Sequence, residues 1–118
     1  MTRTAGRLVQ LADYQSKRKV TYFNRVELDK LLQLYSRHVA RGEWRDYAID
    51  HCAGSAVFSV FRHTHETPLF SIVKYAAGGP RAIEFAVLSG RERLASGRAL
   101  DDVLAVFRKK LTLVHPQR

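Results

Sequence analysis

The nine-residue segment G-E-W-R-D-Y-A-I-D, from Gly42 to Asp50, separates two different hydrophobic periodicities. Before it, apolar side chains recur every three to four residues, as on one face of a helix; after it, they alternate every second residue, as on a strand. Gly42 can adopt a left-handed conformation without steric cost and is a typical helix C-terminal cap. Together with Trp44 and Tyr47, whose large rings favour burial, it predicts a structural helix–strand corner rather than a chemical site.

The helix before this corner has recognisable start and end signals. Asn24 is a favourable N-cap, and Glu27 three residues later completes a capping-box pattern. The apolar face of this helix is predicted to consist of Leu28, Leu31, Leu32, Tyr35 and Val39. A second helix, ended by Pro116, is predicted near the C-terminus. Its apolar stripe is Leu100, Val103, Leu104, Phe107 and Leu111.

Between the helices the sequence predicts four strands and a short fifth one. The first, after Trp44, alternates carboxylates with apolar groups and suits an edge or a solvated face of the sheet. Residues 56–62 are apolar on both faces and suit its interior. We therefore expect an α+β fold with an N-terminal helix, an antiparallel meander of four to five strands and a C-terminal helix. Both helices are expected to pack on one sheet face. The other face then carries apolar groups that the N-terminal arm, a dimer partner or a ligand would cover.

The length and composition fit one domain. The chain has 118 residues, of which 46% are hydrophobic, enough for a single core. We expect a flexible basic N-terminal arm at 1–19, a single α+β domain at 20–114 and a basic C-terminal tail at 115–118. No apolar run reaches the roughly 18 residues of a membrane span, and the N-terminus lacks the apolar core of a secretory signal. One cysteine fits a reducing compartment, so a cytoplasmic location is expected.

The positive charge is concentrated at the two ends of the chain. Residues 1–25 carry six basic side chains against a single acidic one, and residues 108–118 carry four basic side chains and no acid. Residues 26–107 hold ten of each sign and are neutral overall. Because basic segments attract phosphates through counterion release, the ends are candidate contacts for nucleic acid backbone; a soluble tail without a partner is the alternative. The candidate residues are Arg3, Arg7, Lys17, Arg18, Lys19, Arg108, Lys109 and Lys110.

Catalytic and metal-binding patterns are weak in this sequence. On one strand, Asp46 and Asp50 would lie about 13 Å apart, farther than the ~5–9.5 Å between paired glycosidase carboxylates. His63 and His65 form a weak metal-binding candidate that lacks a second ligand pair. Cys52 has no neighbouring base that faces it. We therefore predict a protein that is not an enzyme and needs no cofactor.

Three segments carry a resemblance to a known family. They are G-E-W-R-D-Y-A-I-D, A-V-F-S-V-F-R at 56–62 and the closing helix pattern L-x-x-V-L-x-V-F-x-K-K-L. From about residue 22 to 114 the chain resembles a small group of alphaproteobacterial proteins known only as a domain of unknown function. The resemblance implies a bacterial cytoplasmic protein, and it brings no activity, cofactor or site residue.

Two functional hypotheses follow from these observations. The first is a small binding module whose basic ends contact nucleic acid backbone without reading bases. The second is a protein-interaction or assembly subunit, which includes a homodimer, that uses the outer sheet face or an edge strand. Neither involves a membrane.

Overall fold

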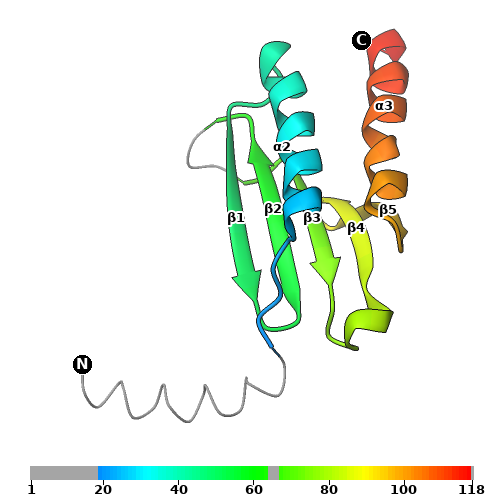
Figure 1. Ribbon diagram of the computed structural model, residues 1–118. Coiled ribbons are helices and arrows are strands. Elements are labelled where there is room, and N and C mark those ends of the chain that lie inside the picture. Colours follow the sequence, from blue (N-terminus) through cyan, green and yellow to red (C-terminus); the bar gives the residue numbers. More distant parts are fainter. Residues whose placement is uncertain (1–18, 64–66, 118) are drawn as a thin grey trace, which may run out of the picture.

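The computed structural model describes residues 19–63 and 67–117. Its elements are α2 (Arg25–Ala40), β1 (Asp46–Cys52), β2 (Ser55–Phe61), β3 (Phe70–Tyr75), η1 (Pro80–Ala82), β4 (Glu84–Ser89), β5 (Glu92–Gly97) and α3 (Leu100–Gln117) (Figure 1). The strands form one antiparallel sheet in the order β1-β2-β3-β4-β5. The predicted α+β meander is confirmed, with five strands. The expectation that Pro116 ends the second helix is wrong, because α3 includes Pro116 and runs to Gln117.

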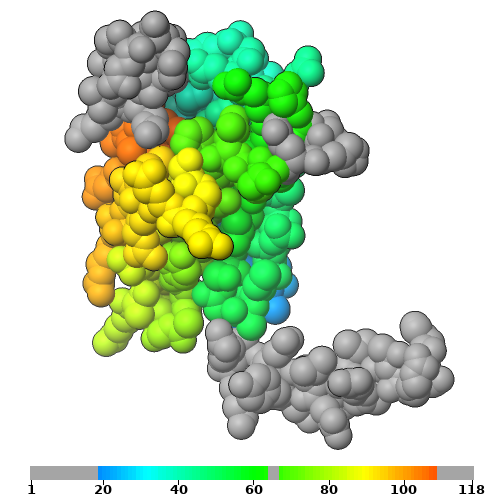
Figure 2. Space-filling view, turned by 180° about the vertical axis from the view of Figure 1, so that it is seen from behind, coloured from blue at the N-terminus to red at the C-terminus, as the bar shows by residue number. Residues whose placement is uncertain are grey.

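Both helices stand in front of the sheet in Figure 1. Helix α3 packs against β4 and β5, and α2 crosses the other half of the sheet. The Tyr35 ring of α2 lies 4.8 Å from the Tyr47 ring of β1. Seen from behind, the green and yellow strands form the middle of the surface (Figure 2). The described residues therefore form a two-layer structure in which neither α2 nor α3 covers the second sheet face (Figure 1 and Figure 2).

The register of β2 shows how its apolar residues divide between the two sheet faces. Ala56, Phe58 and Val60 belong to the buried cluster beneath the helices and have no exposed surface. Because successive side chains of a strand point to opposite faces, Val57 and Phe61 lie on the outer face. β1 is an edge strand with six exposed residues out of seven. The expected positions of both strands are thus confirmed.

The buried face of α2 differs from the prediction. Leu31 and Leu34 are buried together with His38, whereas Val39 is 40% exposed. Leu28, Leu32 and Tyr35 are partly buried and pack against the core cluster. Apolar periodicity overlooks His38 because histidine counts as polar, yet its ring fits the core when a neighbouring carboxylate satisfies its ring nitrogen.

The start of α2 is fixed by a polar network. Asn24 Oδ1 accepts from the Glu27 N–H at 2.8 Å, and Glu27 Oε1 accepts from the Asn24 N–H at 2.8 Å, so the capping box is present. Lys74 in the central strand β3, only 7% exposed, donates to Glu27 Oε1 at 2.8 Å and to the Tyr22 carbonyl at 2.9 Å. This buried ion pair joins the first turn of α2 to the middle of the sheet.

Candidate functional site

The corner between α2 and β1 is a packed structure. Gly42 has φ 75°, in the left-handed region that glycine tolerates. The indole of Trp44 is 3% exposed; it stacks on the His38 ring at 4.0 Å and meets the Phe107 ring edge-on at 5.5 Å. Tyr47 is 39% exposed and stacks on Phe58 at 5.2 Å. These contacts hold the C-terminal end of α2 against both β1 and α3.

His38 is held by a carboxylate within the corner, that of Glu43. Its Nδ1 lies 2.6 Å from Glu43 Oε1. Since a carboxylate only accepts hydrogen bonds, this contact places a proton on Nδ1. Burial lowers the pKa of His38 below its ordinary value, the Glu43 contact opposes this change, and the nearby Arg41 and Arg37 charges lower the pKa further. His38 is therefore neutral at neutral pH.

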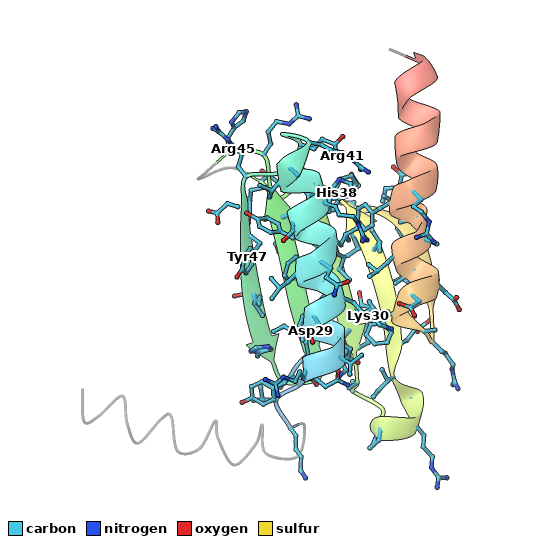
Figure 3. The ribbon with its side chains drawn as sticks, turned by 45° about the horizontal axis from the view of Figure 1, so that its top comes forward. Asp29, Lys30, His38, Arg41, Arg45 and Tyr47 are labelled. Atoms are coloured by element: carbon cyan, nitrogen blue, oxygen red, sulfur yellow. The ribbon has the colours of Figure 1, made fainter. Side chains whose placement is uncertain are left out.

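A groove of about 750 Å³ runs between α2 and α3 next to this histidine. We call it the α2–α3 groove. Its apolar floor includes Leu34, Leu104 and Phe107 together with His38, and its rim carries the charged side chains Lys30, Arg37, Arg41, Asp101 and Arg108. Figure 3 shows Lys30, His38 and Arg41 on the side of α2 nearer α3, whereas Arg45 and Tyr47 lie on the opposite side, toward β1.

The charges at the rim are unevenly compensated. Lys30 Nζ and Asp101 Oδ2 form an ion pair at 2.9 Å that joins the two helices. Within the part of the chain that the structure describes, Arg37 and Arg41 form no ion pair. Both are exposed, and Arg108 is exposed on α3 across the groove. Since Lys30 and Asp101 cancel, Arg37 and Arg41 leave two uncompensated guanidinium charges at the rim, and Arg108 adds a third arginine to the lining.

The structure places the predicted nucleic-acid contacts in different regions. Arg108 lies in the α2–α3 groove. Lys19 lines a separate hollow of about 440 Å³ at the other end of the molecule, beside Lys74 and the turn after β3. Arg3, Arg7, Lys17 and Arg18 are outside the described residues, and Lys109 and Lys110 are outside the described side chains. The two described positions therefore lie apart: Arg108 is in the groove with α2, and Lys19 is at the opposite end.

Sequence reasoning missed three members of this basic cluster. Lys30, Arg37 and Arg41 follow one another at seven and four residues along α2, a spacing that puts them on one helix face. The signal was hidden because residues 26–107 are neutral overall. Counting the charges on each helix face, instead of along each segment of the chain, would have revealed this basic cluster.

The weak chemical candidates stay apart. His63 is exposed at the end of β2, and His65 lies outside the described residues. Among residues 19–63 and 67–117 no group of three potential metal ligands comes together. Cys52 is an exposed thiol. Asp46 and Asp50 are exposed on the edge strand β1, away from the groove. Within the described residues neither α2 nor α3 has the length and apolar character that a bilayer crossing requires.

Comparison with known proteins gives one match. Searches of curated proteins and of solved structures give no significant match to the chain. The model of a family described as "Protein of unknown function (DUF2794)" matches residues 21–104, which span α2, the whole sheet and the first turn of α3. This range contains the corner, His38 and every member of the basic rim except Arg108. The match confirms the family resemblance read from the sequence: the chain belongs to the DUF2794 family, whose function is unknown.

Proposed function

We propose that the protein is a non-enzymatic module that binds the phosphate backbone of nucleic acid in the α2–α3 groove, in the cytoplasm. The observation that carries the proposal is the excess of three arginines around one groove, two of which have no ion-pair partner within the described residues. Guanidinium groups match phosphate oxygens in a planar, bidentate geometry and stay charged at any physiological pH.

Binding fits this groove better than catalysis does. The groove is lined by three arginines, which do not exchange protons near neutral pH. Lys30 and Asp101 are engaged with each other. His38 is held by Glu43 and kept neutral by burial, so it shapes the floor of the groove. Such a surface can hold an anion in place.

The groove favours backbone contacts over base contacts. Proteins that hold unpaired bases stack them on accessible aromatic rings. The aromatic residue in this groove, Phe107, is 2% exposed, and Trp44 behind it is 3% exposed. The exposed aromatics among the described residues, Tyr22 and Tyr47, lie outside the groove. We therefore expect affinity that does not depend on sequence and falls steeply with salt.

Salt-dependent binding of the full-length chain tests the proposal. Fluorescence anisotropy with a labelled 20-base-pair duplex is recorded over a series of salt concentrations for the wild type and for the triple variant Arg37→Gln, Arg41→Gln, Arg108→Gln. Loss of three phosphate contacts is expected to weaken binding at low salt by about tenfold or more, and to flatten the plot of log K against log salt by about 3.

A matched control removes equal charge elsewhere. The triple variant Arg62→Gln, Arg81→Gln, Arg91→Gln changes three exposed arginines that do not line the groove. It is expected to keep most of the affinity and nearly the full salt slope. Equal losses in the two triple variants would mean that only net charge matters, and no loss in the groove variant would contradict the proposed site.

A further inference from the structure

The centre of the outer sheet face consists of small residues, three of which, Ser59, Val73 and Ala86, are buried. Strand register places Val57, Ser59, Ser71, Val73 and Ala86 side by side on this face. Larger apolar groups surround them and are partly exposed: Phe61, Tyr75 and Leu88. Neither helix covers this face (Figure 2). Sheet faces with small central side chains let two sheets approach to the ~10 Å spacing of a β-sandwich.

The two lateral edges of this face carry opposite charges. Asp46 and Asp50 are exposed on the β1 edge, and Arg93 is exposed on the β5 edge. In the part of the chain that the structure describes, none of the three forms an ion pair. Among the described residues, the hydrogen bond of these carboxylates is accepted by Asp46 Oδ1 from the adjacent Tyr47 N–H, at 2.8 Å. These edge charges therefore have no evident role within a single molecule.

The register also fixes the height of these charges along the strands. One row across the sheet contains Ala48, Ser59, Ser71, Leu88 and Arg93. Arg93 is thus level with Ala48, and the two aspartates lie on the same face of β1, about 7 Å to either side of that level. An arginine brought over the β1 edge at constant height would enter between the two carboxylates.

Two-fold symmetry produces this arrangement. Suppose that a second copy faces the outer sheet face and is related to the first by a two-fold axis parallel to the strands. Each residue then keeps its position along the strand direction, and the order of the strands across the sheet is reversed. The β5 edge of each copy then lies over the β1 edge of the other, and β3 faces β3 across the axis. An axis perpendicular to the strands would instead stack β1 on β1, which brings aspartates against aspartates.

From this complementarity we infer that the outer sheet face binds a second copy of the same chain. The copies form a face-to-face sandwich whose two-fold axis runs parallel to the strands, and Arg93 of each copy enters between Asp46 and Asp50 of the other. The face measures roughly 20 by 20 Å, which is small beside the ~800 Å² per partner of a standard interface. We therefore expect a reversible dimer with a dissociation constant on the order of 10 μM.

Charge reversal tests both the face and its symmetry. Sedimentation of full-length protein at several concentrations is expected to show a monomer–dimer equilibrium for the wild type. The variant Arg93→Asp and the double variant Asp46→Arg, Asp50→Arg are each expected to weaken self-association at least ~10-fold, since both edges of the dimer become repulsive. When the two variants are mixed, both edges become complementary again, and a heterodimer is expected to form.

A cross-link reports the orientation of the two copies. In a Cys52→Ser background, Ser71→Cys places a thiol on β3 close to the axis, and a bismaleimide spanning about 10 Å is expected to join two copies. Ser36→Cys, on the exposed side of α2, serves as the control and is expected to remain monomeric.

Three results would overturn the inference. The first is a wild type that stays monomeric at about 200 μM, well above the expected dissociation constant. The second is a mixture of the two charge-reversal variants that does not associate. The third is a monomer that begins to associate only after residues 1–18 are deleted, because this would assign the outer face to the N-terminal arm.

Discussion

At the N-terminal end of α2 the functional charges are buried and paired, whereas at its C-terminal end they are exposed and largely uncompensated. Glu27 is engaged by Lys74 and by the Asn24 backbone, and the side chains of the Lys74–Glu27 pair are only 9% and 14% exposed. Arg37 and Arg41 point into solvent with no described ion-pair partner. Charge on a single helix therefore serves two purposes: the N-terminal end anchors the helix, and the C-terminal end remains available for a ligand.

Breaking the buried pair should have the largest effect on stability. Lys74→Ala leaves the Glu27 carboxylate buried without its cation, and we expect it to lower the free energy of unfolding by about 3 kcal/mol. Urea denaturation followed by circular dichroism measures this change. The exposed Lys30–Asp101 pair offers a matched control, because its two side chains are 39% and 70% exposed. Lys30→Ala removes this contact, and a surface ion pair contributes at most about 1 kcal/mol to the free energy of unfolding. Equal losses in the two variants would contradict the contrast between the ends.

Substitutions at the C-terminal end of α2 should lower the affinity for DNA and leave the stability nearly unchanged. Arg37→Gln with Arg41→Gln removes exposed charge near the helix C-terminus, so the free energy of unfolding is expected to change by less than about 1 kcal/mol. Affinity for a DNA duplex, however, should fall at low salt, and the salt slope should flatten by about 2. If these arginines only stabilise the helix dipole, the melting temperature would fall while the affinity stayed constant.

His38 should make a smaller contribution to the free energy of unfolding, and this contribution depends on pH. Because burial holds its pKa below the ordinary value near 6.5, the unfolded chain takes up a proton before the folded protein does as pH falls. The stability due to neutral His38 is therefore complete above pH 6.5 and is lost on acidification below it. Urea denaturation from pH 7.5 to 5 measures the trend, and His38→Gln should reduce it. An unchanged slope in this variant would show that other groups cause the acid sensitivity.

An anion in the groove should act on the same histidine. A bound phosphate stabilises the protonated ring and must raise the pKa of His38, since linkage is reciprocal. Titration of the His38 ring by NMR, with and without a short duplex at constant ionic strength, measures this shift. His63, which lies outside the groove, provides the internal reference. A pKa of His38 that does not respond to the duplex would separate this residue from the binding site.

The parts of the structure that were predictable depend on local signals. Asn24 and Glu27 are three residues apart, and Gly42 ends its own helix, so neighbouring residues suffice to place α2 and the corner. Lys74 pairs with Glu27 across 47 residues of sequence, and nothing local marks a strand lysine as an anchor. The α2–α3 groove likewise joins Arg41 to Arg108, which are brought together only by the packing of both helices on one sheet face.

The central claim is that the α2–α3 groove holds a phosphate backbone, and chemical-shift mapping tests it most directly. The ¹⁵N–¹H spectrum of the full-length protein is recorded while a short DNA duplex is added. We predict that the largest shifts cluster at residues 37–41 on α2 and around Arg108 on α3, while Arg81 and its neighbours stay unchanged. Shifts confined to residues 1–19, with none at the groove, would contradict the claim.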